Sequence, residues 1–115
     1  MLPKVLFKLA SNICYWFLHF QVGYATNFSA DDAYNPVAYA ACLHRDLRDT
    51  DAVIAHPTLP CNSRVFIYSM RTGRSVIAHV GDRGPRHAAL DLAPAITHAL
   101  RANGMERVLF VPMGP

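Results

Sequence analysis

Short runs of apolar and β-branched residues alternate with turn-forming residues along most of the chain. The segments RVFIYSM (64–70) and SVIAHV (75–80) are rich in Val, Ile, Phe and Tyr, which favour strands. The intervening RTGR, with Gly73, is typical of a hairpin turn. Shorter strands are predicted at 26–30, 51–56 and 107–113, and a short apolar run covers 36–43.

One segment has a helical pattern instead. In residues 89–104 (ALDLAPAITHALRANG), Pro94 suits a first helical position and Gly104 suits the stop after the last turn. The apolar residues Leu92, Ile96, Ala99 and Leu100 form a stripe along one side of this helix. Many short strands with a single helix indicate a small closed β-barrel.

The first 25 residues differ from the rest. Lys4 and Lys8 make a basic start, and no Asp, Glu, Lys or Arg follows until Asp31. Small residues near Ala25 complete the pattern of a secretory signal cleaved after that residue, leaving a domain over 26–115. The alternatives are an uncleaved hydrophobic helix that anchors the chain in a membrane, and a core helix. We therefore expect a secreted or periplasmic protein.

Length and cysteine content agree with export. The 115 residues suit one domain with a thin core. Of the three Cys, Cys14 lies in the predicted signal, and Cys42 and Cys61 remain as an even pair. A bridge at that spacing would contribute about 3 kcal/mol to the free energy of unfolding. Two buried free thiols are the alternative.

Charge and histidine positions argue against several classes of function. The chain has a formal net charge of +3, and without the first 25 residues it would hold no Lys and be close to balance. No basic stripe with interleaved aromatic residues is present, so no nucleic-acid partner is predicted. The six His share no face at ligand spacing, so no metal or cofactor is predicted. We expect a monomer, with membrane contact only through the N-terminal segment.

Three motifs together carry a family resemblance. They are AHPTLP (55–60), GDRGP (81–85) and LDL (90–92), separated by the strand–hairpin–strand segment and followed by the helix. This order resembles rare lipoprotein A, of a group that includes expansins, barwin-like proteins and some lytic transglycosylases. The match covers about residues 22 to 113. It implies a mainly β fold, a six-stranded double-psi β-barrel with one short helix.

The resemblance also implies a function. Active members are lytic transglycosylases, which cut the β-1,4 bond between N-acetylmuramic acid and N-acetylglucosamine in peptidoglycan glycan strands and leave a 1,6-anhydro end. His56 and Asp82 match the essential positions, and Asp91 matches the critical aspartate of expansin-like barrels. The family's glutamate, about a dozen residues before the histidine, has no match near Arg45. The alternative is therefore a non-catalytic, expansin-like barrel that binds or loosens wall polysaccharide.

Each candidate residue has a chemical role and a structural alternative. Asp82, fixed between glycines and before Pro85, could protonate the leaving oxygen and then accept the proton of the sugar's 6-hydroxyl; it could instead accept turn amides. His56 could bind substrate or orient Asp82, or be a satisfied barrel-rim histidine. Asp91 is a supporting residue or a helix cap. Arg83 is a supporting, substrate-binding candidate whose guanidinium we expect to point away from Asp82.

Aromatic residues complete the prediction. Tyr24, Phe28 and Tyr39 could form the floor of a sugar-binding groove by stacking, and packing in the core or at the surface is the alternative for each.

Overall fold

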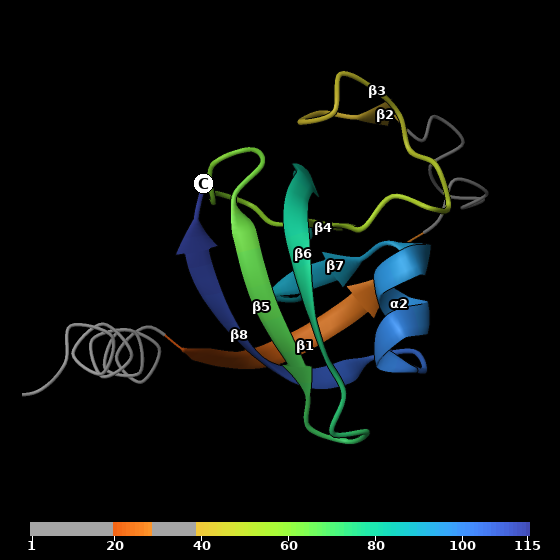
Figure 1. The fold of residues 1–115 in the computed structure, drawn as a ribbon, viewed down its shortest axis with the longest axis vertical. Coiled ribbons are helices and arrows are strands. Elements are labelled where there is room, and N and C mark those ends of the chain that lie inside the picture. Colours follow the sequence, from red (N-terminus) through yellow and green to blue (C-terminus); the bar gives the residue numbers. More distant parts are fainter. Residues whose placement is uncertain (1–19, 29–38) are drawn as a thin grey trace, which may run out of the picture.

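The computed structural model describes residues 20–28 and 39–115. Six strands close into a barrel in the order β1-β7-β4-β6-β5-β8 (Figure 1). The strand bounds are β1 Gln21–Asn27, β4 Val53–Ala55, β5 Arg64–Ser69, β6 Ser75–Asp82, β7 Leu90–Leu92 and β8 Glu106–Gly114. The strands β2 (Tyr39–Ala40) and β3 (Arg45–Asp46) form a separate two-stranded sheet, and α2 covers Pro94–Leu100. The predicted six-stranded barrel with one short helix is confirmed within these residues.

Pairing between distant segments closes the barrel. Strand β1 pairs antiparallel with β8 over Gln21–Ala25 and parallel with β7 over Ala25–Asn27. Strand β4 pairs parallel with β6 and antiparallel with β7. The hairpin of β5 and β6 and the pairing of β5 with β8 complete the circle.

Alternation along the strands separates an inner from an outer face. In β7, Leu90 and Leu92 are buried in the core, so Asp91 between them faces outward. In β4, Ile54 belongs to the core, and Val53 and Ala55 therefore face outward. The core also contains Ile67, Val80, Phe110 and, from the helix, Ile96 and Leu100.

A second, smaller apolar cluster covers part of the outer face. Val53 packs there with Leu47 and Ala93, and Leu43 and Phe28 border it. A Cβ on Gly81 would lie 2.7 Å from the Cβ of Val53, so glycine allows β6 to approach β4 at this point. The segment containing β2 and β3 thus lies against the barrel wall beside the end of β6.

The helix begins as predicted and ends earlier. Pro94 occupies the first turn, whereas Arg101, at φ 51°, ends the helix three residues before Gly104. Residues 90–92, which the sequence pattern joined to the helix, form β7 instead. Their alternation of buried, half-buried and buried positions fits a strand between β1 and β4. Among the described residues, no helix has both the length and the apolar character needed to cross a membrane.

The predicted domain boundary lies inside a strand. Cleavage after Ala25 would remove the five residues that pair with β8. The strand predicted at 26–30 in fact begins at Gln21, because its first residues were attributed to the signal. Most of the predicted signal or anchor, residues 1–25, falls on residues 1–19, outside the described part, and it stays a prediction.

Candidate functional site

Four residues of neighbouring strands form one row on the outer face of the barrel. Strand register aligns Thr26 with Asp91 and Asp91 with Ala55, and a register shift after Ile54 brings Asp82 opposite Ala55. Because neighbouring strands lie about 4.8 Å apart, the Cα atoms of Asp91 and Asp82 are separated by about 10 Å across the small side chain of Ala55. We call Thr26, Asp91, Ala55 and Asp82 the acidic row.

Asp91 is fixed in this row by its neighbour on β1. The Thr26 hydroxyl donates a hydrogen bond of 2.9 Å to Asp91 Oδ1. Tyr24 lies two residues before Thr26 on the same side of β1, about 7 Å along the strand, and is 53% exposed. An exposed aromatic ring thus lies close to a half-buried carboxylate, a combination that suits the faces and hydroxyls of a sugar.

Asp82 holds residues 39–51, the segment that contains β2 and β3, against the barrel. We call this the outer segment. Its Oδ1 accepts the backbone N–H of Ala41 at 3.0 Å and that of Arg83 at 2.8 Å. The next amide, that of Cys42, donates to the carbonyl of Gly81 at 3.0 Å. The structure therefore contains the hydrogen bonds from backbone amides that were the structural alternative to a catalytic role for Asp82. The residue is nevertheless half-buried, not fully enclosed.

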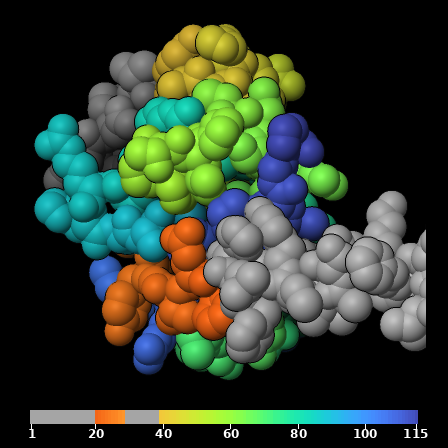
Figure 2. Space-filling view, turned by 90° about the vertical axis from the view of Figure 1, so that its left-hand side faces the viewer, coloured from red at the N-terminus to blue at the C-terminus, as the bar shows by residue number. Residues whose placement is uncertain are grey.

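The predicted disulfide is present between Cys42 and Cys61, with a Cα–Cα distance of 5.2 Å. It joins the outer segment to the loop that follows His56. Figure 2 shows the gold segment of residues in the forties against the lime-green loop of residues near 60. A disulfide of this kind is typical of an oxidising, extracellular compartment.

A backbone hydrogen bond holds His56 beside Asp82, whereas the two side chains have different partners. The His56 N–H donates to the Asp82 carbonyl at 3.1 Å. The ring nitrogen Nδ1 accepts the amides of Thr58 and Leu59 at 3.1 and 3.0 Å. The ring packs edge-on against Phe110, with centroids 6.4 Å apart. Within the described residues, no hydrogen bond joins the imidazole to the Asp82 carboxylate.

Burial, and secondarily the positive charge of Arg83, lowers the pKa of His56 below its usual value. Because Nδ1 accepts two amides, the neutral ring carries its proton on Nε2. Protonation of Nδ1 would break both hydrogen bonds, which agrees with the direction of the shift.

This arrangement predicts a pH effect on stability. Since the folded pKa of His56 is lowered, the unfolded chain binds more protons, and stability should fall as the pH drops below about 6.5. The pKa values of Asp51 and Glu106 are also lowered, and their contributions should be lost only at more acidic pH, below about 4. Melting temperatures measured from pH 7.5 to 4.5 should show the histidine step.

Two variants separate the titration of the His56 imidazole from the role of its Nδ1 atom as acceptor of two backbone amides. In H56N the side-chain oxygen can accept the same two amides without titrating, so the melting temperature should be close to that of the wild type at pH 7.5 and flat down to pH 5. H56A should be less stable at both pH values. A wild-type profile identical to that of H56N would contradict the assignment.

Arg83 points away from Asp82. Its guanidinium donates to the carbonyls of Leu59 and His56, the latter at 3.3 Å, and approaches the sulfur of Cys61 at 3.4 Å. It therefore supports the loop at 56–61 and leaves the Asp82 carboxylate to the amides and to solvent.

Near the expected position of the family's glutamate, the described residues form an ion pair. Arg45 lies on β3 and binds both carboxylate oxygens of Asp51, at 2.7 and 2.9 Å. Asp51 also accepts the amide of Arg48 at 2.7 Å, so its carboxylate holds the outer segment together. Among the described residues, no group of three or more His, Cys, Asp or Glu could hold a metal ion.

Comparison with known proteins supports the fold. No protein-family model and no curated protein matches the sequence. A point mutant of the Clavibacter michiganensis expansin in complex with cellohexaose superposes with a TM-score of 0.59 at 20% identity, over 84% of this chain and 53% of the expansin. The Streptomyces papain inhibitor gives 0.57 at 20% identity over 80% and 94%, and cerato-platanin 3 from M. perniciosa gives 0.52 at 12% over 81% and 94%.

These similarities define the fold of the chain. The chain is a double-psi β-barrel, which confirms the predicted fold, and it spans about half the length of the expansin. At these identities the likeness concerns the fold, and a specific relation to rare lipoprotein A is not established.

Proposed function

We propose that this barrel binds a strand of cell-wall polysaccharide across the acidic row, as a non-catalytic, expansin-like module outside the cell. The single observation that carries this proposal is the placement of exposed Tyr24 beside Thr26 and Asp91 on an outer face. A ring that can stack on a pyranose and a fixed carboxylate that can accept its hydroxyls are the elements of a glycan site. The expansin bound to cellohexaose has the same fold.

A second candidate is lytic cleavage of peptidoglycan. It is supported by the contact that holds His56 beside Asp82 at the end of the row. In this reaction the 6-hydroxyl of N-acetylmuramic acid attacks C1 of the same sugar. The O6–C1 bond forms, the C1–O4 bond to the next sugar breaks, and the 6-hydroxyl loses its proton to the acid/base group. The leaving oxygen gains a proton, so no water is consumed. Asp82 would have to deliver that proton, although its Oδ1 already accepts two amides.

Binding experiments with variants of the row test the first proposal. With cellohexaose and chitohexaose as probes in titration calorimetry, D91N should weaken binding about tenfold or more, because a hydrogen bond to a charged acceptor is lost. Y24A should weaken it about two- to tenfold through loss of stacking. D49N changes an exposed acid outside the row and serves as the matched control. Equal affinities for D91N, Y24A and D49N would overturn the proposal.

Mass spectrometry separates binding from cleavage. Purified protein is incubated with glycan strands stripped of their peptides, and the products are searched for anhydro ends. Ends that form with the wild type and disappear in D82N would establish the second candidate, since the Asn oxygen can still accept the two amides and keep the fold. Binding without new ends supports the first.

A further inference from the structure

A hollow of about 600 Å³ lies beside α2, away from His56 and Asp82. Arg74 borders it from the hairpin between β5 and β6, and the other lining residues belong to the helix or follow it. We call it the arginine hollow, and its main lining residues are Arg74, Pro94, Thr97, His98, Arg101 and Ala102. Its size is within the range of small-ligand pockets.

The charge of the arginine hollow is positive. Arg74 and Arg101 line it together with the imidazole of His98, and no Asp or Glu is among its lining residues. Within residues 20–28 and 39–115, neither Arg74 nor Arg101 takes part in an ion pair. Two guanidinium groups beside one hollow thus have no carboxylate partner in the described part of the chain.

Two carbonyls at and just after the C-terminal end of α2 already have side-chain partners. The Leu100 carbonyl accepts the Thr72 hydroxyl at 2.8 Å, and the Arg101 carbonyl accepts Nη2 of Arg71 at 2.6 Å. Arg71 itself binds the buried carboxylate of Glu106. These two carbonyls are therefore engaged by Thr72 and Arg71, and the side chains of Arg74 and Arg101 remain available to a ligand.

We propose that the arginine hollow binds an oxyanion, a carboxylate or phosphate group. The planar guanidinium presents paired donors that match both groups, and two arginines can bind one anion from two sides. An oxyanion is favoured over a neutral ligand because each unpaired guanidinium gains most from a charged acceptor.

The position of the hollow connects it to the glycan. Pro94, at one end of its lining, follows Asp91 of the acidic row by three residues, and the seven-residue helix extends about 10 Å from there. The lining of the arginine hollow therefore starts three residues beyond the row along the chain. Resting on the proposed function, a polymer that reaches both places would be an anionic one, whose acidic groups enter the hollow while the neutral part of the chain crosses Tyr24 and Asp91.

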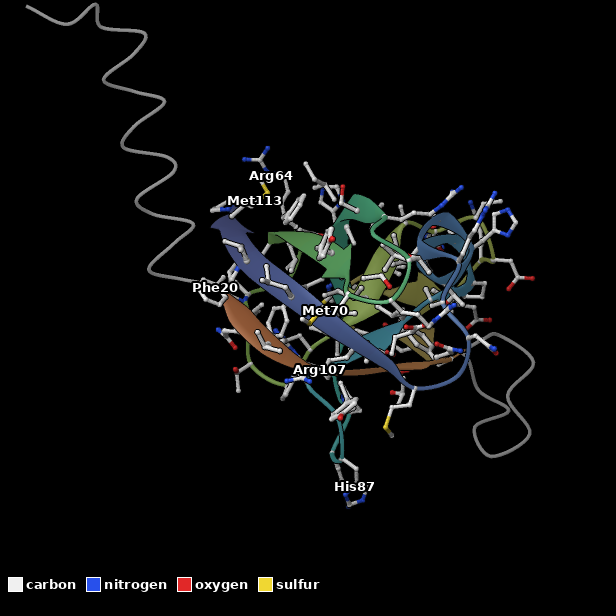
Figure 3. The ribbon with its side chains drawn as sticks, turned by 90° about the horizontal axis from the view of Figure 1, so that it is seen from below. Phe20, Arg64, Met70, His87, Arg107 and Met113 are labelled. Carbon is white, nitrogen blue, oxygen red and sulfur yellow. A yellow bond between two sulfur atoms is a disulfide. The ribbon has the colours of Figure 1, made fainter. Side chains whose placement is uncertain are left out.

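The first test measures the anion site by itself. Sodium acetate and inorganic phosphate are added to the ¹⁵N-labelled full chain, and the side-chain Nε–H signals of all arginines are followed by NMR. The signals of Arg74 and Arg101 should shift in a saturable way. The signals of Arg64 and Arg107, exposed on β5 and β8 (Figure 3), should follow only the general salt effect. Indistinguishable shifts for the two pairs of arginines would overturn the site.

The second test uses polymers that differ in charge. Chitohexaose is neutral, stripped glycan strands carry the carboxylate of N-acetylmuramic acid, and poly(glycerol phosphate) carries phosphate. The double variant R74A/R101N should weaken binding of at least one anionic polymer tenfold or more and leave chitohexaose unchanged. Asn is chosen at 101 because it tolerates the left-handed conformation found there. The polymer that loses more affinity identifies the source of the anion.

Controls separate this inference from the function proposed above. R64A removes an exposed arginine of β5, a strand that is not part of the row, and should change no affinity by more than twofold. R74K/R101K keeps the charge and should recover only part of the affinity, since lysine lacks the paired donors. If R74A/R101N behaves like R64A, the anion site is wrong even where D91N still weakens chitohexaose binding. If chitohexaose does not bind at all while acetate or phosphate does, the glycan proposal fails and the anion site stands.

Discussion

Replacing Cys42 and Cys61 together by alanine should lower the free energy of unfolding by about 3 kcal/mol, because the bridge closes a loop over a sequence separation of 19. For a domain of this size the melting temperature should drop by roughly 10–20 °C. Chemical denaturation followed by circular dichroism would measure both, with and without reductant on the wild type.

The effect should also be local. The bridge holds the segment whose Ala41 amide binds Asp82. In the double variant, the amides of 40–47 should exchange with deuterium faster than those of β5 and β8, which lie in the barrel sheet. C14A, a cysteine change outside the described residues, is the control. A double variant as stable as C14A, with unchanged exchange at 40–47, would show that the disulfide contributes little.

Truncating Phe110 to alanine should cost about 3–5 kcal/mol. This side chain is 2% exposed, lies in the main core, and supports the ring of His56 from its edge. F110L keeps most of the volume and should cost less than about 1.5 kcal/mol. Urea unfolding of the two variants gives the difference directly.

The Phe110 variants also test whether the core side chain of Phe110 shields the His56 imidazole from solvent. With the aromatic edge gone, solvent reaches His56, and the pKa of its imidazole should rise toward the ordinary value near 6.5. Titration of the ring protons by NMR in F110L, which remains folded, measures this change. An unchanged imidazole titration would mean that Phe110 does not contribute to the burial of His56.

The sequence allowed prediction of the elements whose signals are local. Strands β5 and β6 alternate in composition around a turn with Gly73, and Pro94 fixes the start of the helix. The Cys42–Cys61 bridge followed from the count of cysteines. These features depend on neighbouring residues or on composition, so a single sequence is sufficient for them.

What the sequence did not show depends on pairing between distant segments. Strand β7 has only three residues and is recognisable as a strand only between β1 and β4. Thr26 was not a candidate, because its contact with Asp91 spans 65 positions. The partners of His56 Nδ1 are local amides, and its HPTL context could have indicated a turn cap.

Pairing of β1 with β8 has a consequence for biogenesis. The strand nearest the start of the described chain needs residues 106–110 as its antiparallel partner, so the barrel cannot close until the last strand has been synthesised and, if the chain is exported, translocated. Before that point β1 and β5 each lack a neighbour. If the chain is exported, it should therefore cross the membrane unfolded, without a competing native state, and acquire its fold in a single late event on the far side.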